Sequence, residues 1–184
     1  MIVIIAILAT LTTISTAAMT SILRRKDLRA TAAHIQSVLQ MTDAEGQTQG
    51  AYRGVRFTQA GQQWNYAVYQ DGNDNGVTTA DIAAGIDRMI QPSRPLLPTG
   101  SIAIVGFPPA GVPDPDSGAP MPPGSRPIRF GRANLCSFSE NGTCTPGTVY
   151  LTDGVASAAA IRCSGASGRI HILYYGFDGP RWSE

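Results

Sequence analysis

The sequence predicts an α+β protein in which one long N-terminal α-helix packs on an antiparallel β-sheet domain. Three observations support this fold class. No Gly or Pro occurs before Gly46, so nothing interrupts a helix that starts at Met1. From Gly46 onward, short apolar and β-branched runs alternate with turn residues, as in a chain of short strands. All of the 20 Gly and 13 Pro residues lie in this second part.

The first 23 residues form an uncharged apolar segment with the length of a membrane span, since a bilayer's hydrocarbon core needs about 20 apolar residues in a helix. Residues 24–45 continue the helix with one apolar face. That face is made by residues at steps of three and four: Leu28, Ala32, Ile35, Val38, Leu39 and Thr42. We therefore predict three parts: a membrane-spanning or filament-core segment at 1–23, its amphipathic continuation at 24–45, and a globular β-rich domain at 46–184.

A cleaved secretory signal is one alternative for the apolar start. Such a signal has an apolar region of about 7–15 residues that follows basic residues. Here nothing basic precedes the apolar run, and the helical pattern continues past Ala17 and Ala18. A plain membrane anchor for a small outer domain is the other alternative.

The elements after Gly46 are predicted in order. Residues 52–58 and 64–69 flank a Gly-containing turn and predict an antiparallel hairpin. Residues 71–88 are polar, with a short helical piece at 79–82. We expect a buried strand at 102–107, an exposed Pro- and Gly-rich loop at 108–127, and closing strands at 127–130, 148–152, 157–163 and 168–175.

Charge and composition exclude some classes of function. The net charge is +1 with 15% charged residues, so no global field attracts nucleic acid or acidic substrates. The chain has two histidines, His34 on the expected helix and His171 on an expected strand, and no phosphate-binding loop or His/Cys metal motif. We predict no catalytic residues, and an enzyme anchored in a membrane is the least favoured interpretation.

The three cysteines are too few for a disulfide scaffold. Cys136 and Cys144 flank a turn-rich segment, and we predict a disulfide between them in an oxidising compartment. Cys163 lies in an apolar strand-like run and is expected as a buried thiol. Three reduced cysteines are the alternative.

The opening Met-Ile-Val-Ile-Ile-Ala-Ile-Leu-Ala resembles the N-terminal helix of type IV pilins and type II secretion pseudopilins, just past their Phe-Thr-Leu-Ile-Glu-Leu start. The later layout resembles the GspH/FimT branch of this superfamily: a hairpin, an Asp/Asn/Gly-rich segment that ends at Asp81, and a strand–turn–Gly-Arg–strand ending. The helix glutamate, the processing site and the frequent helix proline of the family are not present. If the C-terminal domain lies outside the cytoplasm, the basic residues 24–26 oppose the positive-inside tendency, which suggests that basic residues upstream of Met1 are missing.

The resemblance implies a pilin-like fold and a structural subunit of a type IV pilus-like or pseudopilus filament. Such a subunit is stored in the inner membrane and then polymerises into an extracellular or periplasmic filament. The implied partners are copies of itself, other pilins, the membrane before assembly and the inner-membrane assembly machinery. Packing of the apolar helix against its copies buries it from water. The implied assembly residues are Ile2, Ile4, Ile5, Ile7, Leu8, Leu11 and Ile14.

The alternative function is that of a minor FimT-like pilin that binds DNA for uptake. Gly168-Arg169-Ile170-His171 is similar to the Gly-Arg-x-Arg tail of those proteins, and Arg162 and Arg181 lie nearby in the sequence. However, His171 is largely neutral near pH 7, so one phosphate contact is lost. DNA is therefore not expected as a partner.

The segment from Asp71 to Gly76 resembles the start of a calcium loop, with oxygen side chains at alternating positions. The candidate ligands are Asp71, Asn73, Asn75 and Asp81. The closing acid of such a loop falls on Ile82, one residue after Asp81. We therefore favour a turn that caps its own backbone, with a structural calcium ion as the alternative and no required cofactor.

Overall fold

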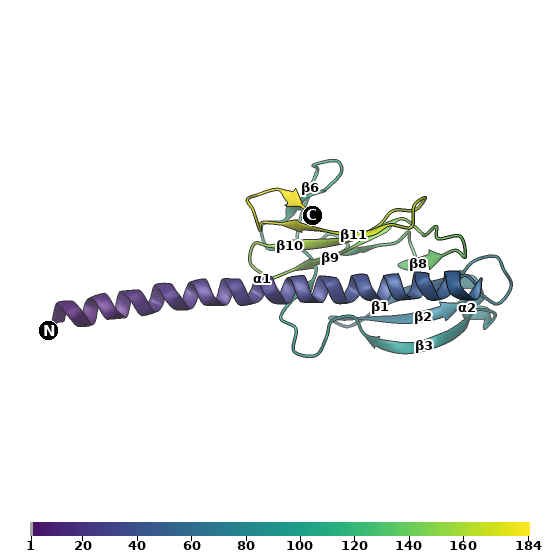
Figure 1. The fold of residues 1–184 in the computed structure, drawn as a ribbon, viewed down its shortest axis with the longest axis horizontal. Helices are drawn as coiled ribbons and strands as arrows, with labels where there is room; N and C mark the ends of the chain where they lie inside the picture. The colour runs from purple at the N-terminus through teal and green to yellow at the C-terminus, as the bar shows by residue number, and fades with distance from the viewer. Residues whose placement is uncertain (1) are drawn as a thin grey trace.

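Residues 2–184 are described by a computed structural model of the protein, with side chains described from Met19 onward. One long helix, α1 (Ile2–Gln49), runs between two antiparallel sheets, which lie on either side of its second half (Figure 1). The first half of α1 extends beyond the sheets. The predicted α+β class, with a long N-terminal helix and antiparallel sheets, is confirmed.

Helix α1 continues past Glu45, the predicted end, and stops at Gln49. Gly50 takes a left-handed conformation with φ of 59°. Its N–H donates to the Gln47 carbonyl at 3.3 Å, and the Ala51 N–H donates to the Gly46 carbonyl at 3.0 Å. These two bonds form a Schellman cap. Gly46 is tolerated inside the helix because one Gly costs only about 1 kcal/mol relative to Ala.

Sheet A has four strands in the order β3-β2-β1-β8. The predicted hairpin is confirmed as its centre, but the other two strands were not predicted. The strand at 88–95 was missed because it contains Pro92 and Pro95; an edge strand tolerates proline, since its outward N–H groups need no partner. The strands are β1 (Arg53–Ala60), β2 (Gln63–Gln70), β3 (Arg88–Pro95) and β8 (Leu135–Phe138).

Sheet B has six strands, in the order β12-β11-β10-β9-β4 with β7 also paired to β9. The predicted closing strands are confirmed within a few residues. The strands are β4 (Ile104–Val105), β7 (Ile128–Arg129), β9 (Gly147–Thr152), β10 (Ala158–Cys163), β11 (Ile170–Tyr175) and β12 (Trp182–Ser183).

The expected buried strand at 102–107 is wrong in two respects. Only Ile104 and Val105 pair, and they do so with β9 alone, so β4 is a short edge of sheet B. The side chains of Ile102 and Ile104 are 48% and 53% exposed. The continuous apolar run indicated burial, yet no element covers its outer side chains.

The elements outside the two sheets are small. The polar region after β2 contains the short helix α2 (Thr79–Ala84), as predicted. The Pro- and Gly-rich loop contains a small hairpin of two strands with two residues each, β5 (Val112–Pro113) and β6 (Pro120–Met121). The loop therefore has more order than the sequence indicated.

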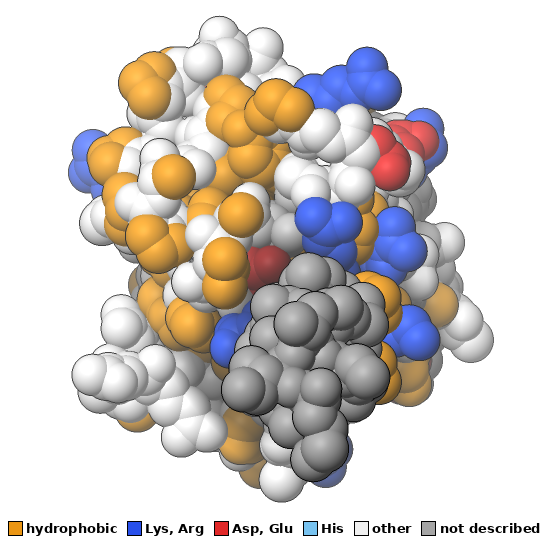
Figure 2. Space-filling model, turned by 90° about the vertical axis from the view of Figure 1, so that its left-hand side faces the viewer, with side chains coloured by type: hydrophobic (Ala, Val, Ile, Leu, Met, Phe, Trp, Pro, Cys, Tyr) orange, Lys and Arg blue, Asp and Glu red, His pale blue; other side chains and the backbone are white. Residues whose placement is uncertain are grey.

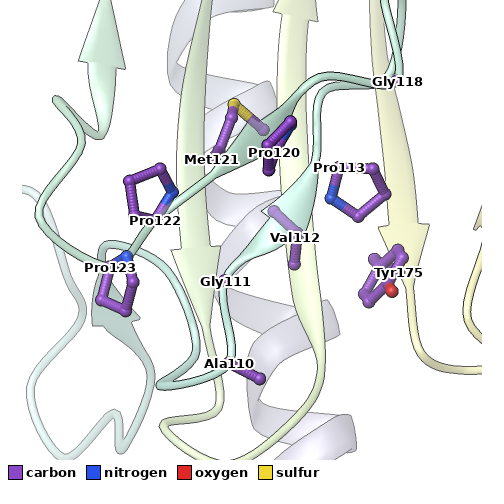
Figure 3. Close-up of a pocket in the computed structure, with 10 residues that line it drawn as sticks. All are labelled: Ala110, Gly111, Val112, Pro113, Gly118, Pro120, Met121, Pro122, Pro123 and Tyr175. Carbon is purple, nitrogen blue, oxygen red and sulfur yellow. The ribbon is translucent and has the colours of Figure 1, made fainter.

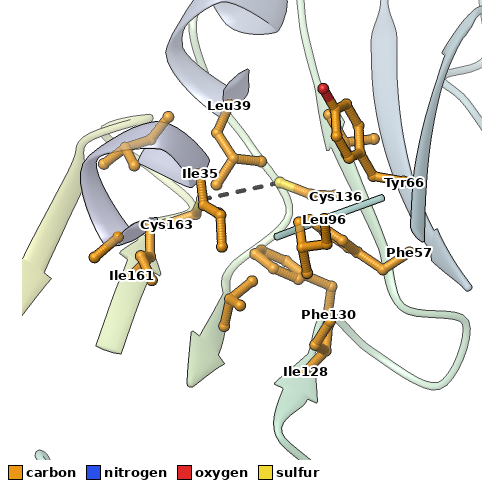
Figure 4. Packing of buried hydrophobic residues seen from close by; sticks show 14 of the residues in the cluster. Ile35, Leu39, Phe57, Tyr66, Leu96, Ile128, Phe130, Cys136, Ile161 and Cys163 are labelled. Atoms are coloured by element: carbon orange, nitrogen blue, oxygen red, sulfur yellow. Dashed lines mark hydrogen bonds between the residues drawn. The ribbon is translucent and has the colours of Figure 1, made fainter. Parts of the chain in front are cut away.

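The core forms around the predicted apolar face of α1. Leu28, Ala32, Ile35 and Leu39 are at most 1% exposed and pack in one cluster with residues of both sheets (Figure 4). Residues of sheet A in this cluster include Val55, Phe57, Val68, Cys136 and Phe138, and those of sheet B include Val149, Leu151, Ala159, Ile161, Cys163 and Ile170. The helix was predicted to cover one sheet. Its apolar face instead packs against both sheets.

We predict that Ile35→Ala lowers the free energy of unfolding by about 2–5 kcal/mol, because it leaves a cavity between helix and sheets. Denaturant unfolding of the full chain in mild detergent measures this loss. Met41→Ala is the matched control on the same helix, since Met41 is 58% exposed. Equal losses for the two variants would contradict the packing.

Candidate functional site

The candidate assembly surface is the part of α1 that lies outside the sheets, residues 2–23, which we call the protruding segment (Figure 1). The backbone is helical over all seven predicted assembly residues from Ile2 to Ile14. Their side chains lie outside the described residues, so their packing stays a prediction. Within the part of the chain whose side chains are described, no helix has the length and apolar character that a membrane span requires.

The protruding segment meets the domain at an apolar, exposed turn. Met19, Ile22 and Leu23 are 59%, 50% and 49% exposed. At the next residue the helix touches the domain, because the guanidinium of Arg24 donates to the Asp153 carbonyl at 3.2 Å. The apolar character of α1 therefore continues up to the point where the domain begins.

A single carboxylate fixes α1 to the loop before β4. Asp27 Oδ2 accepts hydrogen bonds from the Ser101 hydroxyl and from the N–H groups of Ile102 and Ala103, each at 2.9 Å. Hydrogen bonds to an ionised acceptor are stronger than those between neutral groups. Sequence reasoning missed this contact because residues 27 and 101 come together only in the fold.

The basic residues after the protruding segment also hold the helix on the domain. Arg25 Nη2 donates to the Gly176 carbonyl at 3.0 Å. The guanidinium groups of Arg25 and Arg29 lie 5.5 and 4.6 Å from the centre of the Phe177 ring. The spacing of four residues places both on one helix face above the same aromatic ring.

Three of the candidate calcium residues lie in the loop between β2 and α2 and the fourth, Asp81, lies in the first turn of α2; they bond to one another and to the backbone. The carboxylate of Asp71 accepts from the N–H groups of Asn73 at 3.0 Å and Gly76 at 2.6 Å. Asp81 Oδ2 accepts from the Asn75 amide at 3.1 Å. This is the geometry of the favoured self-capped turn.

One residue that holds this loop was missed, and it lies after α2, directly before β3. Asp87 is 3% exposed and accepts from the N–H groups of Gly72 at 3.3 Å and Thr78 at 2.9 Å, which closes the base of the loop. Among the described side chains, no group of three or more His, Cys, Asp or Glu is arranged to hold a metal ion.

The three candidate DNA-binding arginines lie near the C-terminal strands. Arg162 makes a two-pronged ion pair with Asp116, at 2.7 and 2.5 Å. Arg169 Nη2 lies 3.6 Å from a carboxylate oxygen of Glu184, and Arg181 is exposed. A phosphate would have to compete with the carboxylates at Arg162 and Arg169.

His171 faces Arg162 across the β10–β11 pair. Partial burial, together with the positive charges of Arg162 and Arg169, lowers the pKa of His171. The imidazole is therefore neutral near pH 7 and adds no positive charge to the arginines.

The cysteines do not follow the predicted pairing. All three are buried free thiols, and Cys136 Sγ lies 4.0 Å from Cys163 Sγ of sheet B (Figure 4). The Cys136–Cys144 disulfide is not formed: Cys144 pairs across the hairpin with Phe138, and its Sγ lies 3.5 Å from the Ser164 carbonyl. Burial raises the pKa of the Cys136 thiol.

A shallow apolar pocket of about 590 Å³ lies between the β5–β6 hairpin and the end of β11 (Figure 3). The hydroxyl of Tyr175 is the only side-chain polar group among its lining residues, and these include no carboxylate, imidazole or thiol. The pocket thus offers an apolar contact surface. Its lining is Ala110, Gly111, Val112, Pro113, Gly118, Pro120, Met121, Pro122, Pro123 and Tyr175.

No family model matches the chain, and neither a curated protein nor a solved structure is significantly similar to it.

We predict that Asp71→Ala lowers the free energy of unfolding by about 1–3 kcal/mol, because two backbone N–H groups lose their acceptor. Millimolar calcium is expected to leave the melting temperature of the unaltered chain unchanged, since ligand binding to the native state would raise it. Asp74→Asn is the control, at an exposed position of the same loop. A rise in melting temperature with calcium that Asp71→Ala removes would favour the calcium site.

We predict that oxidised glutathione joins Cys136 to Cys163, because their sulfur atoms are 4.0 Å apart and a disulfide needs a separation of about 2.05 Å. Burial raises the pKa of the Cys136 thiol and so lowers the fraction of thiolate. The reaction is therefore slow, because the thiolate is the reactive form. Mass spectrometry of peptides from the non-reduced protein identifies the pair. Cys144→Ser should keep the crosslink and Cys163→Ser should lose it. A disulfide-linked peptide pair containing Cys136 and Cys144 would instead support the disulfide predicted from the sequence.

We predict no meaningful DNA affinity at about 150 mM salt. Each phosphate contact adds about 0.9 to the slope with which the logarithm of the binding constant falls with the logarithm of salt concentration, and two or three contacts give only weak binding at this salt concentration. Fluorescence anisotropy with labelled duplex measures it. Asp116→Asn, which releases Arg162 from its ion pair, should strengthen binding only at low salt. Submicromolar affinity that disappears in Arg169→Ala would support DNA uptake.

Proposed function

We propose that this chain is a structural subunit of a type IV pilus-like or pseudopilus filament, and that it polymerises through its N-terminal helix. The observation that supports the proposal is the division of α1 into two parts. Its 48 residues form one continuous helix, which spans about 72 Å at 1.5 Å per residue. One half is the core of the domain, and the other half extends away from it (Figure 1).

An apolar helix that leaves its own domain needs a second partner that excludes water. A bilayer is one such partner, because a helix satisfies its backbone hydrogen bonds internally. A bundle of the same segment from neighbouring subunits is the other, because it removes the same apolar surface from water. The small residues between Thr10 and Ala18 allow close approach of helices. We therefore propose storage in the inner membrane followed by assembly into an extracellular or periplasmic filament.

The contacts at the start of the domain suit this role. Asp27 holds the loop at 101–103, while Arg25 and Arg29 lie against Phe177. Each contact opposes rotation of the domain about α1. A filament subunit needs this rigidity, since the domain's position on the filament surface then follows from the packing of the helices. The partners proposed are copies of this chain, other pilins and the membrane machinery that assembles them.

The DNA-binding alternative has less support. Arg162 and Arg169 are ion-paired with carboxylates of the same chain, and His171 is neutral near pH 7. The structural role needs none of these residues as a binding site, and it needs no catalytic group or cofactor.

We predict that Ile7→Asp abolishes filaments while the domain keeps its stability. An acidic residue costs up to about 2.5–3.5 kcal/mol in a membrane helix, the largest cost being at its centre, and residue 7 lies inside the apolar segment and far from the buried face that starts at Leu28. Negative-stain microscopy and sedimentation of sheared material detect the filaments. Ile7→Val is the matched control and should assemble normally. Ordinary filaments from the Asp variant would contradict the helix-core model.

A further inference from the structure

The side of the domain from which the protruding segment emerges carries exposed apolar side chains from three separate parts of the chain. We call this side the exit face. Figure 2 looks onto it along α1: hydrophobic side chains cover much of this face, and Lys and Arg side chains lie around and between them. Its exposed apolar residues, between 48% and 59% accessible, are Met19, Ile22, Leu23, Ile102, Ile104 and Val155.

Two contacts with α1 bring these parts together. Asp27 accepts from the N–H of Ile102 at 2.9 Å and so holds the loop before β4 against the helix. Three residues earlier, Arg24 donates to the carbonyl of Asp153, whose side chain accepts from the N–H of Val155 at 2.9 Å. The apolar side chains therefore flank the helix within the turns where it leaves the domain.

The charges of the exit face are mainly positive. Arg24, Arg25, Lys26 and Arg29 are exposed on the same turns of α1. The nearest carboxylates are used inside the protein: Asp27 accepts three hydrogen bonds from residues 101–103, and Asp153, 5% exposed, accepts three from residues 155–157. Asp178 remains exposed beside them.

We propose that the exit face rests on the anionic phospholipid headgroups of the bilayer, with its apolar side chains inserted between them. The proposal rests on the proposed function, in which residues 1–23 are stored in that bilayer. Apolar side chains next to Lys and Arg are the combination that interfacial membrane binding uses. Two copies that met through this face would bring like charges together, whereas anionic headgroups neutralise them.

The test places the photocrosslinker p-benzoylphenylalanine at Ile104 or at Val155 of the full chain. Both side chains are more than half exposed, so the larger group can be accommodated. The control position is Ile90, an exposed apolar residue near the start of β3, at the opposite end of the domain (Figure 1). Each protein is reconstituted in vesicles of phosphatidylethanolamine with phosphatidylglycerol, and separately in vesicles of phosphatidylcholine. Flotation measures how much protein associates with the vesicles. Irradiation followed by mass spectrometry then identifies the molecules that crosslink at each position.

We expect phospholipid adducts at positions 104 and 155, with several-fold more adducts in the anionic vesicles than in the phosphatidylcholine vesicles. At position 90 we expect no adducts. Protein that floats with the vesicles but gives crosslinked dimers or no adducts at 104 and 155 would overturn the exit-face proposal and leave the proposed function intact. Protein that fails to float would instead overturn membrane storage, and the exit-face proposal with it.

Discussion

The burial of one face of α1 by two sheets is the interaction on which the rest of the structure depends. Leu28, Ala32, Ile35 and Leu39 are almost inaccessible because sheet A closes on them from one side and sheet B from the other. Without the helix, each sheet would expose a large apolar face to water. The second half of α1 is therefore part of the domain, and the protruding segment is attached to the centre of its core.

Polar contacts determine where along α1 the domain sits. An apolar helix face alone permits axial sliding and rotation, because hydrophobic contacts have little direction. Asp27 at one end of the buried stretch removes that freedom by accepting from residues 101–103, and Gln36 does so further along by donating to the Ile170 carbonyl at 2.9 Å. Since these bonds require fixed positions, the length of helix that remains outside is also fixed.

The features that were predicted from the sequence depend on short-range patterns. The apolar steps from Leu28 to Leu39 gave the buried helix face, and alternation around Gly61 gave the hairpin of sheet A. The features that were missed depend on distant partners. The strand at 88–95 contains Pro92, which is tolerated because β3 is an edge strand and its pairing with β2 is irregular at that point. Cys136 lies near Cys163 because two different sheets meet there, and Asp27 accepts from a loop about 75 residues further along the chain.

The order of the elements along the chain has a consequence for how the protein reaches its folded state during synthesis. Helix α1 is made first, but the strands of sheet B that cover it, β10 and β11, end at Cys163 and Tyr175, near the end of the chain. The apolar face of the helix thus stays open until almost the whole polypeptide has been made. A chain that stops early would present that face to water or to proteases. Completion of synthesis and shielding of the helix therefore nearly coincide, and a prematurely ended chain lacks the cover that sheet B provides.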